Sequence, residues 1–101
     1  MILYNVTVKI DLDIEEEWLP WVKENFIART MATNLFSDQK IFKLLNEADD
    51  DGITYAIQFY ANSIAEIDYF LNNYAQNIAE EHRLRFKNKH VAFMTLLESV
   101  D

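Results

Sequence analysis

Two patterns of side-chain spacing alternate along the sequence, and their order restricts the fold more than any other feature. Residues 2–11 alternate between apolar and mixed positions, as a half-buried strand does. Asp51-Gly52 stands between two apolar runs, which is a strong signal for a hairpin turn. Strands are expected over 2–11, 35–48, 53–60 and 89–99, and helices over 13–33 and 63–87. The predicted order is strand, helix, strand, strand, helix, strand.

This order defines a fold class. A chain of 101 residues has room for one core, so residues 1–101 are expected to form a single domain. Right-handed crossovers place both helices on one face of a four-stranded antiparallel sheet. The expected fold is α+β, the ferredoxin-like βαββαβ arrangement. The side chains expected under the helices are Ile2, Tyr4, Val6, Val8, Tyr55, Ile57 and Phe59.

The helix ends carry their own signals. Ser63 and Glu66 predict a capping box at the start of the second helix, and Asp13 with Glu16 predicts one at the start of the first. Pro20 lies too deep in the first helix to leave its hydrogen bonds intact. A kink or a restart is therefore expected in the turn before Pro20.

The hairpin turn also sets the register of its strands. With Asp51-Gly52 as a two-residue turn, Asp50 opposes Ile53, and the faces of both strands follow. A longer loop shifts the pairing and can exchange the faces of one strand. The two-residue turn places the following side chains away from the helices: Leu3, Asn5, Thr7, Ile41, Lys43, Leu45, Ala56, Gln58 and Tyr60.

The face away from the helices is too apolar to stand alone in water and too polar for a dry core. Strands of ordinary length give it a footprint of roughly 300 Å², which ranks among the larger apolar patches of monomers. A second copy of the chain is the expected cover, and the homodimer becomes an α+β barrel with a cavity. A half-solvated sheet on a monomer is the alternative. The residues expected to line the cavity and to bind a small organic ligand are Asn5, Thr7, Gln58, Tyr60 and His90.

Four segments carry a resemblance to a known family. They are residues 1–10, Glu-Glu-Trp-Leu-Pro-Trp at 16–21, Met-Ala-Thr-Asn-Leu-Phe at 31–36 and Asp-Gly-Ile-Thr-Tyr-Ala at 51–56. Over essentially its whole length the chain resembles a family of short bacterial proteins of unknown function, itself similar to the dimeric α+β barrel superfamily. The resemblance implies a fold and a homodimer, but no activity. Asn34 stands where the pattern favours glycine, and Asn also adopts positive φ.

Catalytic and metal-binding signals are weak. Some relatives on this barrel are cofactor-free monooxygenases, or haem-degrading enzymes that pair a strand-one Asn with a Trp and a His on the second helix. Asn5 fits the first position, but residues 63–87 contain no Trp, and His82 lies near the helix end. His82 and His90 lack metal-site spacing, cysteine is absent, and Asp49–Asp51 lack the alternation of a calcium loop. No metal and no cofactor are expected.

Charge and targeting signals restrict the partners. The net charge of −8 opposes binding to nucleic acid or to an anionic membrane surface. No apolar run reaches the ~20 residues of a membrane span, and the opening strand leaves no space for a signal peptide, so a cytoplasmic location is expected. The sequence predicts a small-ligand-binding or assembly module. A cofactor-independent, monooxygenase-like enzyme acting in the same cavity is the alternative.

Overall fold

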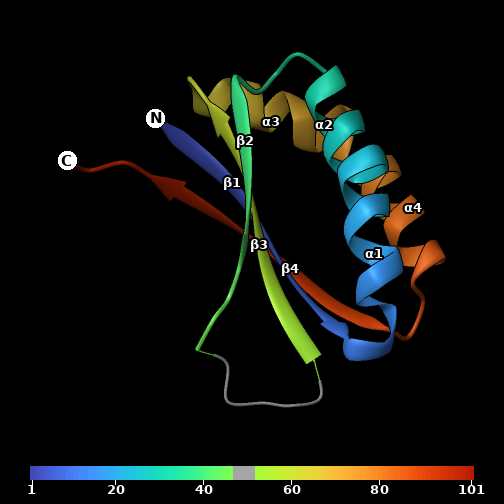
Figure 1. Cartoon of the computed structure of the whole chain (residues 1–101). Coiled ribbons are helices and arrows are strands. Elements are labelled where there is room, and N and C mark those ends of the chain that lie inside the picture. The colour runs from blue at the N-terminus through green and yellow to red at the C-terminus, as the bar shows by residue number, and fades with distance from the viewer. Residues whose placement is uncertain (47–51) are drawn as a thin grey trace.

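A computed structural model describes residues 1–46 and 52–101 and confirms the ferredoxin-like βαββαβ fold. Its antiparallel sheet has the strand order β2-β3-β1-β4. The strands are β1 (Ile2–Asp11), β2 (Asp38–Lys43), β3 (Gly52–Ala61) and β4 (His90–Glu98). All helices of the described residues lie on one side of the sheet, and the other side is uncovered (Figure 1).

Each of the two expected helices is broken into shorter pieces. The first comprises η1 (Leu12–Ile14), α1 (Glu15–Trp21), η2 (Val22–Ile27) and α2 (Ala28–Ala32), and the second comprises α3 (Ile64–Asn73) and α4 (Ala75–Arg85). The break expected before Pro20 lies after it: α1 continues through Pro20 to Trp21, and η2 then has the wider π-helical geometry. The break in the second helix lies at Tyr74, whose φ is −129°. Residues 64–85 contain no Pro and no Gly, so the sequence has no signal for this break.

Of the two predicted capping boxes, the one at Ser63 is present in its side-chain cap. Ser63 Oγ accepts from the backbone N–H of Glu66 at 3.4 Å and donates to the Glu66 carboxylate at 3.4 Å. The box expected at Asp13 is wrong, because the first helix begins without a side-chain cap. The Asp13 carboxylate instead accepts from Lys89 Nζ at 2.8 Å.

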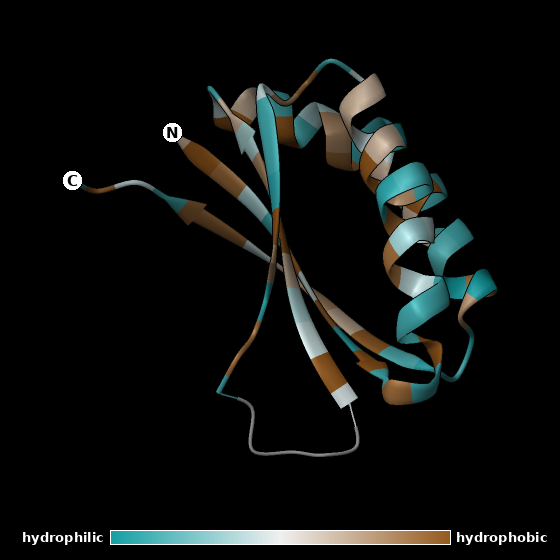
Figure 2. Ribbon diagram, in the orientation of Figure 1, coloured by the Kyte–Doolittle hydropathy of each residue, from teal (hydrophilic) through white to brown (hydrophobic). Residues whose placement is uncertain are grey.

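The core lies between the sheet and the helices, as expected. Val8, Tyr55, Ile57 and Phe59 are buried beneath Trp18 and its neighbours. The alternation of β1 explains this, since every second side chain points into the helix layer. Apolar segments recur along β1, β3 and β4, and hydrophilic segments are frequent along α1 and α4 (Figure 2).

The predicted register of β2 is wrong. Ile41 pairs with Ile57 and Lys43 pairs with Tyr55, so Ile41 and Lys43 lie on the helix side of the sheet. Lys43 Nζ accordingly reaches α1, where it donates to Glu15 Oε2 at 3.1 Å. The same carboxylate accepts from the Tyr55 hydroxyl at 2.6 Å, and these two hydrogen bonds lower the pKa of Glu15.

The register differs because the connection is longer than two residues. β2 ends at Lys43, whose partner in β3 is Tyr55, and the turn at Asp49–Asp51 lies outside the described residues. Leu45 follows the strand, is 90% exposed and belongs to neither face of the sheet. The sheet face away from the helices, hereafter the open face, carries Leu3, Asn5, Thr7, Lys40, Phe42, Ala56, Gln58, Tyr60, Val91, Phe93, Thr95 and Leu97.

Candidate functional site

Four of the predicted site residues lie together on the open face. Asn5 pairs with Gln58 of β3 and with Thr95 of β4, so a polar row crosses the middle of the sheet. Asn5 Nδ2 donates to Thr7 Oγ1 at 3.1 Å, and the Tyr60 hydroxyl donates to Gln58 Oε1 at 3.3 Å. Asn5 is only 8% exposed, and its Oδ1 has no hydrogen-bond partner within the described residues.

Apolar side chains surround this polar row. Phe42 on β2 and Val91, Phe93 and Leu97 on β4 are all exposed. Such side chains are costly to leave in water at the rate of about 25 cal/mol per Å² of apolar surface. The open face therefore has the composition of a surface that another protein covers.

The fifth predicted residue, His90, lies on the opposite face from the other four. It pairs with Ile10, whose side chain belongs to the core, so the expectation that His90 lines the open face is wrong. Its Nδ1 lies 2.8 Å from the carbonyl oxygen of Phe86, and a carbonyl accepts only, so Nδ1–H is the donor. The ring of His90 meets the ring of His82 edge-on, at 4.5 Å between centroids.

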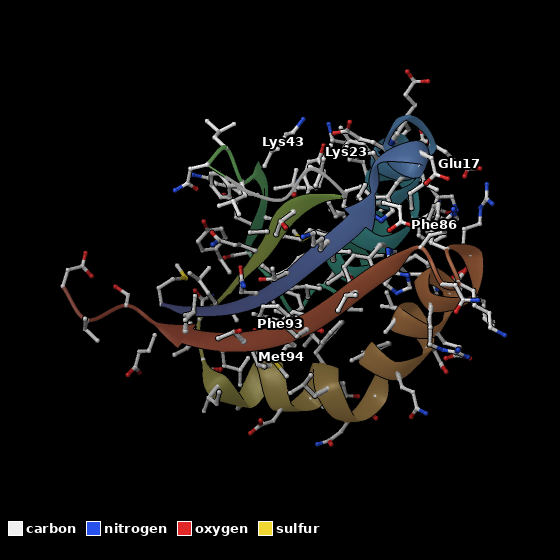
Figure 3. The ribbon with its side chains drawn as sticks, turned by 90° about the horizontal axis from the view of Figure 1, so that it is seen from below. Glu17, Lys23, Lys43, Phe86, Phe93 and Met94 are labelled. Atoms are coloured by element: carbon white, nitrogen blue, oxygen red, sulfur yellow. The ribbon has the colours of Figure 1, made fainter. Side chains whose placement is uncertain are left out.

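A pocket of about 410 Å³ lies beside these two histidines, between α4 and the helix side of β4. It exists because β4 is an edge strand and α4 packs towards η2, which leaves Ala92 and Met94 exposed. Met94 and Phe93 are labelled on this strand in Figure 3. The other lining residues are Tyr4, Val6, Val8, Val22, Phe26, Ile57, Gln76, Ala79, Glu80, His82, Arg83 and His90.

His82 has a defined protonation state. The indole N–H of Trp18 donates to His82 Nε2 at 2.8 Å, and indole is a donor only, so the ring proton lies on Nδ1. Burial, with a smaller contribution from the charge of His90, lowers the pKa of His82 to about 4. The imidazole is therefore neutral at pH 7.

The Nδ1–H of His82 remains available for a ligand. Within the described residues this nitrogen makes no hydrogen bond. It is also not fully buried, since the one fully buried side-chain atom without a partner in these residues is Asn5 Oδ1. His82 is one of the residues that line the pocket. The residue was not predicted as a site, although its place four residues after Ile78 continues the buried stripe of the helix.

Two charged side chains at the edge of the pocket neutralise each other. Arg83 donates through Nε to Glu80 Oε2 at 2.9 Å and through a terminal nitrogen to Glu80 Oε1 at 2.5 Å. This bidentate pair leaves no free cation beside the histidines among the described lining residues. The pocket is thus mainly apolar, and its polar side chains outside this ion pair are those of His82, His90, Tyr4 and Gln76.

A family model described as a domain of unknown function (DUF4286) matches residues 1–100. The chain belongs to the DUF4286 family. No curated protein sequence matches it.

The fold of this DUF4286 protein is shared with several solved structures. One from Arabidopsis thaliana has a TM-score of 0.70 at 10% identity, with 100% of this chain and 99% of that chain covered. A dimeric ferredoxin-like protein from an uncultured marine organism has a TM-score of 0.69 at 14% identity, covering 100% and 96%. An antibiotic biosynthesis monooxygenase has a TM-score of 0.64 at 13% identity, covering 100% of both chains. At these identities the likeness concerns the fold alone.

The part of the DUF4286 chain that the structure describes shows neither a cluster of metal ligands nor a membrane-spanning helix. Residues 1–46 and 52–101 hold no cluster of three or more His, Asp or Glu side chains suited to a metal ion. None of the helices in these ranges is long and apolar enough to cross a bilayer.

Proposed function

We propose that this DUF4286 protein is a homodimer that binds a small organic molecule in the pocket between α4 and β4. The observation that carries this proposal is the pocket itself. Its volume of about 410 Å³ falls within the ~300–1,000 Å³ of small-molecule sites. Its floor is apolar, from Val6, Val8 and Ile57, and its few polar side chains include His82 and His90. This combination of an apolar floor and few polar groups is typical of ligand sites.

The open face supports the homodimer. Strands of 9 or 10 residues in β1, β3 and β4, with the shorter β2, span an area of roughly 550 Å². A standard interface buries ~800 Å² on each partner, which a corrugated surface of this footprint approaches. A second copy offers the same mixture of apolar side chains and polar row, so the contact is self-complementary. A cytoplasmic location remains part of the proposal.

A ligand between the two sheets is the other prediction that follows from the dimer. Asn5, Thr7, Gln58 and Tyr60 would line that space, and their role in binding stays a prediction. The helix-side pocket is favoured because a single copy of the chain forms it. The two locations are separated by a variant that fills only one of them.

Catalysis without a cofactor is the second candidate function, and the state of His82 favours it. A pKa of about 4 makes this imidazole a neutral hydrogen-bond donor at pH 7, rather than a cation. His90, whose ring lies 4.5 Å away, has an Nε2 that can accept a proton from a substrate. Proton abstraction from an acidic carbon or hydroxyl is the chemistry that such a pair supports.

Binding is tested by adding naphthalene as an apolar probe. NMR spectra then measure the changes in the methyl chemical shifts of Val8 and Met94. Ala79 lines the pocket and Ala65 is an exposed residue on α3 outside it. Ala79→Trp is expected to abolish the shifts, and the matched Ala65→Trp is expected to keep them. No shift with the wild-type protein, or equal shifts with Ala79→Trp, would rule out this pocket as the site.

A further inference from the structure

The polar end of the pocket presents one donor and one acceptor on neighbouring rings. Trp18 fixes the proton of His82 on Nδ1, and His82 lines the pocket. The Phe86 carbonyl accepts from Nδ1–H of His90, and an imidazole with its proton on Nδ1 has Nε2 as an acceptor. The two rings are nearly perpendicular, at 81°, with centroids 4.5 Å apart. A single group of a ligand can therefore contact both.

A hydroxyl group matches this arrangement in both roles. Its oxygen accepts from His82 Nδ1–H while its hydrogen is donated to His90 Nε2. A carbonyl group can accept from His82 but has no hydrogen to donate to His90. An amine cation has no lone pair with which to accept from His82. A carboxylate has no proton for His90, and the nearest guanidinium, that of Arg83, is already held by Glu80.

The remainder of the pocket restricts the rest of the ligand. Tyr4 and Gln76 also line the pocket, and the other side chains around the histidines are apolar, from Val8 and Val22 to Ala92 and Met94. These apolar side chains offer no partner for further polar groups, and an unpaired polar group placed there would lose its hydration without compensation.

We infer that the ligand of this pocket is a neutral, largely apolar alcohol or phenol whose hydroxyl group bridges His82 and His90. This inference rests on the proposed function, since it names the chemical class that the same pocket takes.

Four naphthalene derivatives of similar size test the inference. In 2-naphthol the hydroxyl can donate and accept, in 2-methoxynaphthalene the oxygen can only accept, in 2-methylnaphthalene neither is possible, and 2-naphthoate is an anion. Dissociation constants are measured by NMR titration at pH 7.5. We expect 2-naphthol to bind roughly tenfold more tightly than 2-methylnaphthalene, because a net hydrogen bond contributes about a factor of ten. We expect 2-methoxynaphthalene to fall between them and 2-naphthoate to bind most weakly.

His90→Phe supplies the matched control. It keeps an aromatic ring at the position and removes Nε2, so 2-naphthol is expected to bind no better than 2-methoxynaphthalene. Retained binding of 2-methylnaphthalene shows that the variant is folded with its pocket intact. If the variant does not fold, the order of the four wild-type constants decides alone.

The outcomes separate the two proposals. Equal binding of all four compounds would overturn the hydroxyl assignment and leave the pocket as a ligand site. Tightest binding of 2-naphthoate would overturn the assignment in favour of an anion site. Binding of none of them would overturn the proposed function as well.

Discussion

The indole N–H of Trp18 on α1 donates to Nε2 of His82 on α4 at 2.8 Å, and the two residues lie 64 positions apart in the sequence. Both side chains are buried, and their rings also meet at 85°. The hydrogen bond therefore tethers α1 to α4 and fixes the tautomer of His82 at the same time.

Trp18→Phe removes the donor and part of the buried volume. We expect the free energy of unfolding to fall by about 2–4 kcal/mol, because the smaller ring leaves a cavity and because Nε2 of His82 loses its donor. Trp21→Phe is the matched control, because Trp21 is half-buried and its indole N–H makes no hydrogen bond within the described residues. A loss of roughly 1 kcal/mol is expected there. Equal losses in urea unfolding would contradict the special role of the tether.

Stability is expected to depend on pH through His82. Its pKa is about 4 in the folded protein and 6.5 when unperturbed, so the unfolded chain binds the proton more readily between these values. The free energy of unfolding therefore falls as the pH decreases from 6.5 to 4, by about 3 kcal/mol in total. His82→Gln still accepts from Trp18 but does not titrate. Unfolding curves measured at stepwise pH should show a shallower decline for this variant, and identical declines would refute the assignment.

The open face is tested by a change of assembly. Leu97 pairs with Leu3 on that face, and Leu84 is exposed on α4. Leu97→Glu would bury two unpaired carboxylates in the homodimer, and we expect its dissociation constant to rise at least ~100-fold. Leu84→Glu should leave the dimer unchanged. Sedimentation velocity distinguishes these outcomes, and a wild-type protein that stays monomeric at high concentration would end the homodimer proposal.

Asn34 is predicted to be replaceable by glycine but not by alanine. Its φ of 62° lies in the left-handed region, as the expected preference for glycine at this position suggested. Asn34→Ala should destabilise the protein by about 1 kcal/mol, because a β-carbon is strained there. Asn34→Gly should change stability by no more than a few tenths of that amount. Thermal unfolding of the two variants side by side provides the comparison.

The architecture was predictable because its signals are local. The alternation of β1 and the capping box at Ser63 identify their elements without reference to the rest of the chain. The face of β2 was not predictable in the same way, because it depends on loop length, and a shift of an odd number of positions moves Ile41 and Lys43 to the other side.

The candidate site was harder to predict than the fold. Both faces of β4 carry apolar side chains. One face has Val91, Phe93 and Leu97, and the other has Ala92, Met94 and Leu96. Composition therefore could not decide on which of the two faces His90 lies. The pocket depends on how far α4 lies from β4, a tertiary relationship with no local signature. The pairing of His82 with Trp18 has the same origin, since it joins two distant helices.

The position of β4 has a consequence for regulation. This strand forms one wall of the pocket and one margin of the open face, so a ligand that displaced Ala92 and Met94 would also displace Val91 and Leu97 on the other side of the strand. Thermodynamic linkage makes such an influence reciprocal. A compound that tightens association of two subunits must itself be retained more firmly as the protein becomes more concentrated, so its apparent affinity would report cellular abundance.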